Sequence, residues 1–226
     1  MFKKVFLFVI QGGSPIWFRP HGRFMITFEH PVIDGTKRKI DIKALFPDIG
    51  KPLKVEIGFG NGGFIFEKVQ RENDANFLGI ELYHRGICSL AKRIRKYNIN
   101  NIIIIYADAK RILVESVQDN ALSELYVNFP DPWPKRRHQK RRLINCNFAK
   151  LIYSKLEHKG RIYLATDSKN YANEMLNSFE GTPGYKNLAG RLRLAQKTPN
   201  HIVTKYEKRF LSNGNKIYYL QYQAQK

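Results

Sequence analysis

The stretch VEIGFGNGG at residues 55–63 determines the fold class of this 226-residue chain. A strand-like apolar run passes into four glycines within six positions, and helical periodicity follows as far as Glu72. Glycines at this point permit a tight turn and let a ligand approach the backbone where the helix begins. The stretch therefore predicts the first strand, loop and helix of a Rossmann-type sheet. Because the spacing from Gly58 and Gly60 fits both G-x-G-x-x-G and G-x-G-x-G, it does not separate a nicotinamide cofactor from S-adenosylmethionine.

Downstream of this loop, short β-branched runs alternate with longer segments of helical period. This alternation predicts right-handed βαβ units and a mainly parallel sheet that helices cover on both faces. Four consecutive isoleucines in 101–107 indicate a central strand that is buried on both sides. The predicted strands are 54–59, 76–82, 101–107, 122–129 and 161–165, and the predicted helices are 63–72, 84–97 and about 142–156.

The two ends of the chain have different patterns. Residues 203–211 and 216–222 read as strands on either side of Ser212-Asn213-Gly214-Asn215, and Asn-Gly between such runs favours a hairpin. The sheet is therefore expected to end in an antiparallel pair. Residues 1–50 are predicted to form an N-terminal extension to one α/β domain at 51–226. Within the extension, 5–10 reads as a strand, because it is too short to span a bilayer and no signal cleavage site follows it.

The chain is strongly basic, with 39 Lys and Arg against 19 Asp and Glu and a formal net charge of +20. Such a charge repels itself in the compact state, and a polyanionic partner relieves the repulsion. Cys88 and Cys146 offer neither metal-ligand spacing nor a disulfide framework. We therefore expect no metal, no membrane association and a cytoplasmic location. The sequence leaves open whether the protein is a monomer or a homodimer.

Acidic residues lie at or near the ends of the first three predicted strands: Glu56, Glu81 and Asp108. Glu56 lies two residues before Gly58, where a carboxylate suits the cationic amino acid group of S-adenosylmethionine and repels a pyrophosphate. Glu81 is placed to bind a ribose diol, and Asp108 to accept a hydrogen bond from an adenine amino group. Alternatively, these acids cap helices or end strands in solvent. Together the three favour S-adenosylmethionine as the cofactor.

The sequence NFPDPWPK at 128–135 ends the fourth predicted strand, at the edge where open α/β sheets bind ligands. Its prolines restrict φ and donate no hydrogen bonds, so they hold a rigid turn. Asp131 can accept hydrogen bonds from a guanine Watson–Crick edge or stabilise the cation formed when a ring nitrogen is alkylated; otherwise it forms an Asx turn. Trp133 either stacks on a base or belongs to the core. Six of the eight residues in KRRHQKRR, 135–142, are basic, which suits contact with phosphates.

Five segments occur in an order that closely resembles the bacterial tRNA (guanine-N7-)-methyltransferase family: VEIGFGNGGF at 55–64, GIE at 79–81, NFPDPWPKRRHQKRR at 128–142, ATDS at 165–168 and TKYE at 204–207. The resemblance runs from about Glu56 to the C-terminus. It implies a Rossmann-like, S-adenosylmethionine-dependent methyltransferase domain with a seven-stranded sheet. The cofactor-binding residues it implies are Glu56, Gly58, Gly60, Glu81, Asp108 and Asp131, with Asp131 also the catalytic residue. The substrate-binding residues it implies are Lys135, Arg137, His138, Gln139, Lys140, Arg141, Arg142, Asp167, Thr204, Lys205, Tyr206 and Glu207.

The expected reaction is methyl transfer from S-adenosylmethionine to N7 of the variable-loop guanine of tRNA, number 46 in tRNA convention. N7 of neutral guanine has a free lone pair, so no proton must be removed before attack. Catalysis can then rest on alignment of the reacting atoms and on stabilisation of the forming cation. Two alternatives stay open: a methyltransferase for an exocyclic amine in another RNA or in DNA, and a non-catalytic RNA-binding protein on the same core. The acids at 56, 81, 108 and 131 argue against the non-catalytic alternative.

Overall fold

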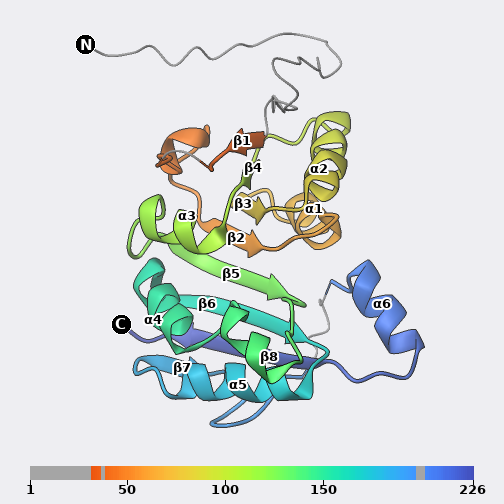
Figure 1. Ribbon diagram of the computed structural model, residues 1–226. Coiled ribbons are helices and arrows are strands. Elements are labelled where there is room, and N and C mark those ends of the chain that lie inside the picture. Colours follow the sequence, from red (N-terminus) through yellow and green to blue (C-terminus); the bar gives the residue numbers. More distant parts are fainter. Residues whose placement is uncertain (1–31, 37–38, 197–201) are drawn as a thin grey trace.

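The computed structural model describes residues 32–36, 39–196 and 202–226, which form an α/β fold around one eight-stranded sheet (Figure 1). The strand order is β1-β4-β3-β2-β5-β6-β8-β7. The strands are β1 (Val32–Asp34), β2 (Leu53–Ile57), β3 (Asn76–Glu81), β4 (Ile102–Tyr106), β5 (Leu122–Asn128), β6 (Leu156–Thr166), β7 (Tyr185–Asn187) and β8 (Tyr218–Ala224). The helices are α1 (Gly63–Arg71), α2 (His84–Lys96), α3 (Ala109–Glu115), α4 (Cys146–Lys155), α5 (Lys169–Glu180) and α6 (Lys205–Ser212), and the short 3-10 helices are η1 (Lys43–Leu45) and η2 (Arg136–Arg141).

The order of the strands reverses at β2. From β2 the chain proceeds through β3 and β4 on one side, and through β5 and β6 on the other, with all these neighbours parallel. The C-terminal ends of β2 and β5 therefore lie side by side, with Ile57 opposite Val127. In open α/β sheets such a reversal leaves a crevice in which ligands bind.

Helices cover the two faces of the sheet through separate apolar clusters. On one face α3, α4 and α5 contribute residues such as Ile112, Phe148 and Met175. On the other face α1 and α2 contribute Ile65 and Leu90, among others. The isoleucines of β4, at 102–105, are at most 2% exposed, which confirms the predicted burial on both sides, although β4 lies next to the edge strand β1 and not at the centre of the sheet.

The predicted fold class is confirmed: the sheet is mainly parallel and ends in antiparallel strands, with β8 between β6 and β7. It has eight strands instead of the predicted seven. Two three-residue strands, β1 and β7, are too short to show a period in the sequence. β1 pairs with β4, with Val32 opposite Ile104, so residues from the predicted extension contribute an edge strand to the sheet. The predicted strand at 5–10 lies outside the described residues.

The predicted strand at 203–211 is wrong, because Lys205–Ser212 is helix α6. The hydroxyl of Thr204 accepts a hydrogen bond of 3.0 Å from the backbone amide of Glu207, and the Glu207 carboxylate accepts one of 3.3 Å from the amide of Thr204. This reciprocal capping box satisfies two amides that a helix start leaves without partners. Thr-x-x-Glu is a signal for the start of a helix, and here it outweighs the strand-like pattern that follows it.

Candidate active site

The C-terminal ends of four neighbouring strands, β4, β3, β2 and β5, surround a cavity of about 350 Å³. Residues at the end of each strand or shortly after it line this cavity, so that Gly58, Glu81, Asp108 and Asp131 face one space. Trp133 and Arg141 line it on the side of the basic loop. A cavity of this size accommodates a small organic cofactor. The structure therefore brings together residues that lie as far apart in the sequence as Gly58 and Arg141, while their individual roles stay predictions.

Glu56 of β2 is almost completely buried, with 2% of its surface exposed. Its Oε1 accepts a hydrogen bond of 3.0 Å from Nδ2 of Asn128, whereas Oε2 has no hydrogen-bond partner among the described residues. Burial raises the pKa of Glu56 to about 8; the hydrogen bond from Asn128 and an interaction with the backbone of Ile65 oppose the shift, and the charge of Glu81 adds to it. A buried carboxylate oxygen without a partner is costly, so this position suits a ligand that brings a cationic donor.

Glu81 holds the glycine loop in shape. Its Oε2 accepts a hydrogen bond of 2.7 Å from the amide of Gly60, and Oε1 accepts bonds from the amides of Leu82 and Tyr83. Gly58 and Gly60 have φ angles of 69° and 53°, in the left-handed region that favours glycine. A Cβ built on either would meet no atom within 4 Å. Open space therefore remains beside the loop, where a ligand can approach the backbone.

Gly86 of α2 supports this loop and was not identified in the sequence as a site residue. A Cβ on Gly86 would lie 1.9 Å from the carbonyl oxygen of Gly60, so only glycine lets the helix come this close. The sequence contains a signal for this role. A glycine inside a helix lowers its stability, so its presence at this position indicates that close packing requires it.

Asp108 both caps a helix and lines the cavity. Its Oδ1 accepts a hydrogen bond of 3.0 Å from the amide of Arg111, which makes Asp108 the N-cap of α3. The alternative interpretation of Asp108 as a helix cap is therefore correct for one of its carboxylate oxygens. Since Asp108 also faces the cavity, its contact with an adenine amino group stays a prediction.

The turn after β5 carries Asp131 on a strained backbone. Phe129 and Trp133, on either side of it, have φ angles of 54° and 41°, which cost a large side chain about 1–3 kcal/mol each. Asp131 is exposed and lines the cavity. The Trp133 ring also lines it, and lies edge-on to His138 with the guanidinium of Arg141 over it at 5.0 Å. Trp133 is therefore a partly buried wall of the cavity and not a core residue.

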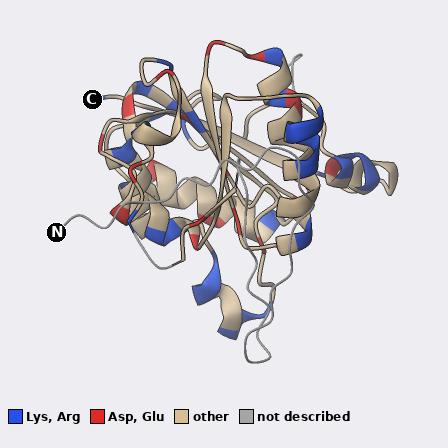
Figure 2. Ribbon diagram, turned by 90° about the horizontal axis from the view of Figure 1, so that it is seen from above, with Lys and Arg blue, Asp and Glu red and all other residues tan. Residues whose placement is uncertain are grey.

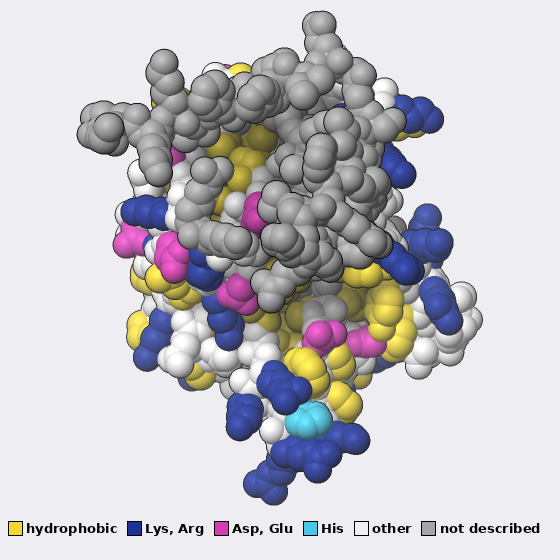
Figure 3. Space-filling model, turned by 45° about the horizontal axis from the view of Figure 1, so that its top comes forward, with side chains coloured by type: hydrophobic (Ala, Val, Ile, Leu, Met, Phe, Trp, Pro, Cys, Tyr) yellow, Lys and Arg dark blue, Asp and Glu magenta, His cyan; other side chains and the backbone are white. Residues whose placement is uncertain are grey.

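The basic loop of η2 presents most of its cations to solvent. Lys135, Arg136, Arg137, Lys140 and Arg141 are exposed, while His138 and Gln139 are partly buried. Figure 2 shows further Lys and Arg residues on helices around the sheet. In Figure 3, Lys and Arg side chains gather around a histidine at one protruding tip of the molecule. A surface of this kind suits a polyanion.

Arg142, at the end of this loop, is different. It is 2% exposed and its guanidinium is enclosed by other groups of the protein. The family resemblance implies that Arg142 contacts the substrate, but its guanidinium is not exposed. The charged groups of the neighbouring cations are exposed.

Four of the five predicted substrate residues near the C-terminus, Asp167, Thr204, Tyr206 and Glu207, have hydrogen bonds within the protein. Tyr206 of α6 donates a hydrogen bond of 2.9 Å to Oδ2 of Asp167, which follows β6, and its ring contacts Phe129 at 4.9 Å. Glu207 is 1% exposed and accepts a hydrogen bond of 2.5 Å from the hydroxyl of Tyr219. Glu207 and Thr204 form the capping box of α6, so the hydrogen bonds of these two side chains stabilise the start of the helix. The side chain of Lys205 is exposed. Substrate binding by these residues stays a prediction.

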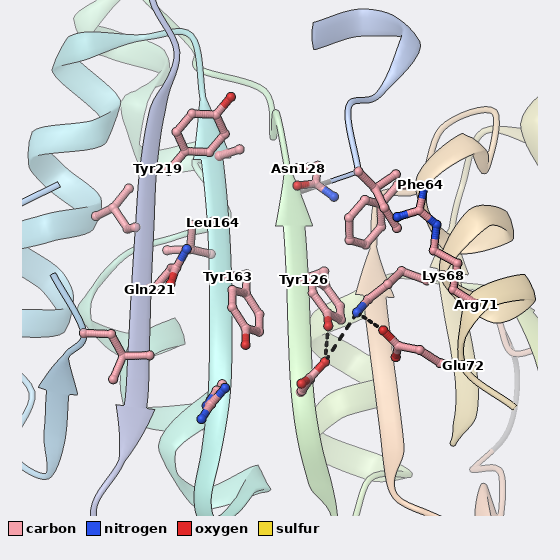
Figure 4. A pocket seen from close by; sticks show the side chains of 16 residues that line it. Phe64, Lys68, Arg71, Glu72, Tyr126, Asn128, Tyr163, Leu164, Tyr219 and Gln221 are labelled. Atoms are coloured by element: carbon pink, nitrogen blue, oxygen red, sulfur yellow. Dashed lines mark hydrogen bonds and ion pairs between the residues drawn. The ribbon is translucent and has the colours of Figure 1, made fainter. Parts of the chain in front are cut away.

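A second cavity of about 440 Å³ lies over β5, β6 and β8, beside α1 (Figure 4). The rings of Tyr126 and Tyr163 stack along it, 5.0 Å apart. Lys68 reaches in from α1, with its Nζ 2.5 Å from a carboxylate oxygen of Glu72. Asn128 lines both cavities, so the residue that bonds Glu56 also forms part of the wall between them. The motifs of the sequence assign no role to Asn128.

The described part of the chain has neither a metal site nor a membrane span. Within residues 32–36, 39–196 and 202–226, no group of His, Cys, Asp and Glu side chains is arranged to hold a metal ion. In the same ranges, no helix is long and apolar enough to cross a bilayer.

Comparison with known proteins places this site in a family. A family model described as "Putative methyltransferase" matches residues 50–220. A tRNA (guanine-N(7)-)-methyltransferase of Buchnera aphidicola subsp. Baizongia pistaciae is 41% identical over 173 residues, which cover 76% of this chain and 72% of the relative. The protein of that name from Geobacter metallireducens is 33% identical over 189 residues, or 84% of this chain and 89% of the relative.

The likeness to solved structures supports the fold alone. The crystal structure of the 16S rRNA methyltransferase KamB matches with a TM-score of 0.56 at 11% identity, covering 81% of this chain and 91% of that one. Family membership rests on the sequence matches and agrees with the motifs around the cavity. The chain belongs to the tRNA (guanine-N7-)-methyltransferase family.

Proposed function

We propose that this protein transfers a methyl group from S-adenosylmethionine to N7 of a guanine in tRNA, namely the variable-loop guanine at position 46. One observation carries the proposal. At the reversal of strand order, Glu56 is a buried carboxylate with an unsatisfied oxygen, and its hydrogen-bond partner Asn128 lines the cavity that the exposed carboxylate of Asp131 also lines. The first suits a cationic cofactor and the second suits the reacting base. The names of the sequence relatives support the same substrate.

The residues around the glycine loop fit S-adenosylmethionine. Glu56 Oε2 would accept a hydrogen bond from the ammonium group of the cofactor. Glu81 already accepts three backbone hydrogen bonds, two of them at Oε1, but a carboxylate has about four acceptor positions, so Oε2 retains capacity for a ribose hydroxyl. Asp108 keeps its second oxygen for the adenine amino group. When bound, the cofactor supplies an electrophilic methyl group on its sulfonium sulfur.

The protein's part in the reaction is alignment and charge stabilisation. The lone pair of guanine N7 attacks without loss of a proton, so no general base is needed for the bond to form. The base becomes cationic as the methyl group is transferred. Asp131, on its proline-restricted turn, would bind the Watson–Crick edge and stabilise this positive charge. Trp133, as a wall of the same cavity, would limit where the base can lie.

The exposed cations of η2 supply contacts to phosphates. They lie beside the cavity, since Arg141 lines it and η2 follows the turn that carries Asp131. Phosphate contacts of this kind hold the RNA in register while the cavity selects the base. The proposed substrate also agrees with the cytoplasmic location predicted from the cysteine content.

Base-resolved mapping of methylation tests the proposal. Unmodified tRNA is incubated with the full chain and S-adenosylmethionine, and N7-methylguanosine is located by chain cleavage at the depurinated position. We expect one product, at the variable-loop guanine. A matched tRNA with 7-deazaguanine at this position keeps the Watson–Crick edge and all phosphates, so it should bind, inhibit competitively and stay unmethylated. Methylation of the deaza tRNA near the normal rate would instead support an exocyclic-amine enzyme. Absence of methylation in any tRNA would overturn the function.

A further inference from the structure

We propose that Arg142 is a positioning residue: it holds the turn that carries Asp131, and it does not contact the RNA. The inference rests on the proposed function, in which Asp131 acts on the target base. It separates Arg142 from the other cations of its loop, because the five exposed ones face solvent while Arg142 points into the protein.

Each nitrogen of the Arg142 guanidinium has a partner within the protein. Its Nε donates a hydrogen bond of 2.8 Å to the carbonyl oxygen of Pro132. Nη2 donates one of 2.8 Å to Oδ1 of Asn170, and Nη1 forms an ion pair with Glu174. The guanidinium lies over the ring of Tyr171 at 4.8 Å. Three of these four partners belong to α5, so Arg142 ties the turn to a helix of the main core.

The prolines restrict φ within the turn but do not fix the turn to the rest of the protein. Pro130, Pro132 and Pro134 have no amide hydrogen, so they cannot donate backbone hydrogen bonds that would anchor it. Phe129 and Trp133 adopt positive φ angles, which persist only where the surroundings impose them. The carbonyl that Arg142 holds belongs to the residue directly after Asp131, so a shift of this bond moves the carboxylate itself.

The connection to α5 continues beyond Arg142. The hydroxyl of Tyr171, whose ring lies under the guanidinium, accepts a hydrogen bond of 2.8 Å from the amide of Ile144. The chain on both sides of Arg142 is thus fixed to α5: the turn through Pro132 and the start of the next segment through Ile144. On the outer side of the turn, Arg141 lies over Trp133 at 5.0 Å. Two consecutive arginines therefore contact the turn, Arg142 at Pro132 and Arg141 at Trp133, and of the two only Arg141 is exposed.

The experiment compares variants that break the tie with one that removes an exposed cation. Arg142→Lys keeps the charge and loses the fork of donors. Glu174→Gln removes a partner of Arg142 and makes the surface less acidic, so it cannot weaken phosphate binding by loss of a cation. Arg137→Ala is the matched control for direct RNA contact. For each variant we measure S-adenosylhomocysteine affinity, tRNA affinity as a function of salt, and kcat and KM for methylation. In a Trp17→Phe background, the fluorescence of Trp133 reports on the turn directly.

We expect Arg142→Lys to lower kcat by about 10- to 100-fold, as misplacement of a reacting group does. Glu174→Gln should lower kcat in the same direction by a smaller factor. In both, the salt slope of tRNA binding and the cofactor affinity should stay within about twofold of the wild type, and Trp133 emission should shift. Arg137→Ala should give a different pattern. The salt slope of tRNA binding should be weaker and the KM for tRNA higher, while Trp133 emission should not change.

The proposal is overturned if Arg142→Lys weakens the salt slope as Arg137→Ala does, or if Glu174→Gln leaves both kcat and Trp133 emission unchanged. These outcomes differ from failure of the proposed function, in which the wild type itself would not methylate tRNA. Should Arg142→Lys fail to fold, Glu174→Gln and Asn170→Ala address the same bonds from the partially exposed side of α5 and give the same decision.

Discussion

Asn128, the last residue of β5, donates a hydrogen bond of 3.0 Å to the buried carboxylate of Glu56 in β2, across the point where the strand order reverses. The bond satisfies one carboxylate oxygen and leaves the other without a partner among the described residues. Burial raises the pKa of Glu56 to about 8, so at neutral pH the carboxyl group is mostly protonated before a ligand binds. A cation arriving at this oxygen would favour the charged form.

Cofactor binding should therefore release a proton. Below about pH 8, binding of S-adenosylhomocysteine must first ionise Glu56, so the affinity should rise with pH up to this value and then level off. Calorimetry at pH 7 in buffers of different ionisation enthalpy should detect close to one proton released. Glu56→Gln should bind more weakly and release none. An affinity independent of pH between 6 and 8 would contradict the role of Glu56 in cofactor binding.

The same pKa predicts how the stability of the ligand-free protein depends on pH. In the unfolded chain Glu56 titrates near its ordinary value of 4.5, and in the folded protein near 8. Between these values the folded state binds more protons, so the free energy of unfolding should fall as pH rises from about 5 to 8. Thermal unfolding should show a smaller decrease in Tm over this range for Glu56→Gln than for the wild type. Equal slopes for the two proteins would show that another group dominates.

Asp131→Asn tests the charge on the proline turn. The amide keeps the size and the exposed position of the side chain but cannot stabilise a cationic base. We expect kcat to fall by about 100-fold or more, while affinities for S-adenosylhomocysteine and tRNA stay near those of the wild type. A turnover close to normal would reduce Asp131 to a residue that merely shapes the turn.

The exposed cations of η2 should determine the salt dependence of tRNA binding. Arg137 and Lys140 are both exposed, and replacing both by alanine should reduce the salt slope by roughly 0.7–0.9 for each phosphate that the protein no longer neutralises. Cofactor affinity should not change. The matched control is Lys150→Ala, an exposed lysine on α4 outside this loop. If the double variant and the control have equal slopes, the RNA binds elsewhere.

Gly86→Ala should damage the glycine loop without touching a ligand. The added methyl group would lie 1.9 Å from the carbonyl oxygen of Gly60, so α2 and the loop must move apart. We expect cofactor affinity to fall by tenfold or more, together with a lower Tm. Ala91→Gly, at a buried position of the same helix, separates the two effects, since it should lower the Tm while the loop and cofactor affinity stay unchanged. Normal affinity in Gly86→Ala would show that the loop adapts to the methyl group.

Local patterns in the sequence were sufficient for the core and for the chemistry of the cofactor loop. Gly58, Gly60 and Gly62 adopt positive φ angles, and tolerance of this conformation is a property of glycine itself. Four consecutive isoleucines in β4 indicate a strand that is buried on both faces, and the structure has them buried. The same locality misleads at 203–211, because alternation and helical capping compete there, and two hydrogen bonds between Thr204 and Glu207 prevail.

The direction of individual side chains depended on the tertiary structure. In the sequence Arg141 and Arg142 are equivalent cations of one basic run. In the fold Arg141 is exposed and lies over the ring of Trp133, whereas Arg142 is buried and donates a hydrogen bond to the carbonyl oxygen of Pro132. That difference depends on Asn170 and Glu174, some thirty positions away, whose bonds compensate the cost of burying a charge. Likewise, the raised pKa of Glu56 requires the sheet that excludes water from it. The sequence by itself determines which residues are available for chemistry, and only the packing of distant segments decides which are buried, charged and aligned.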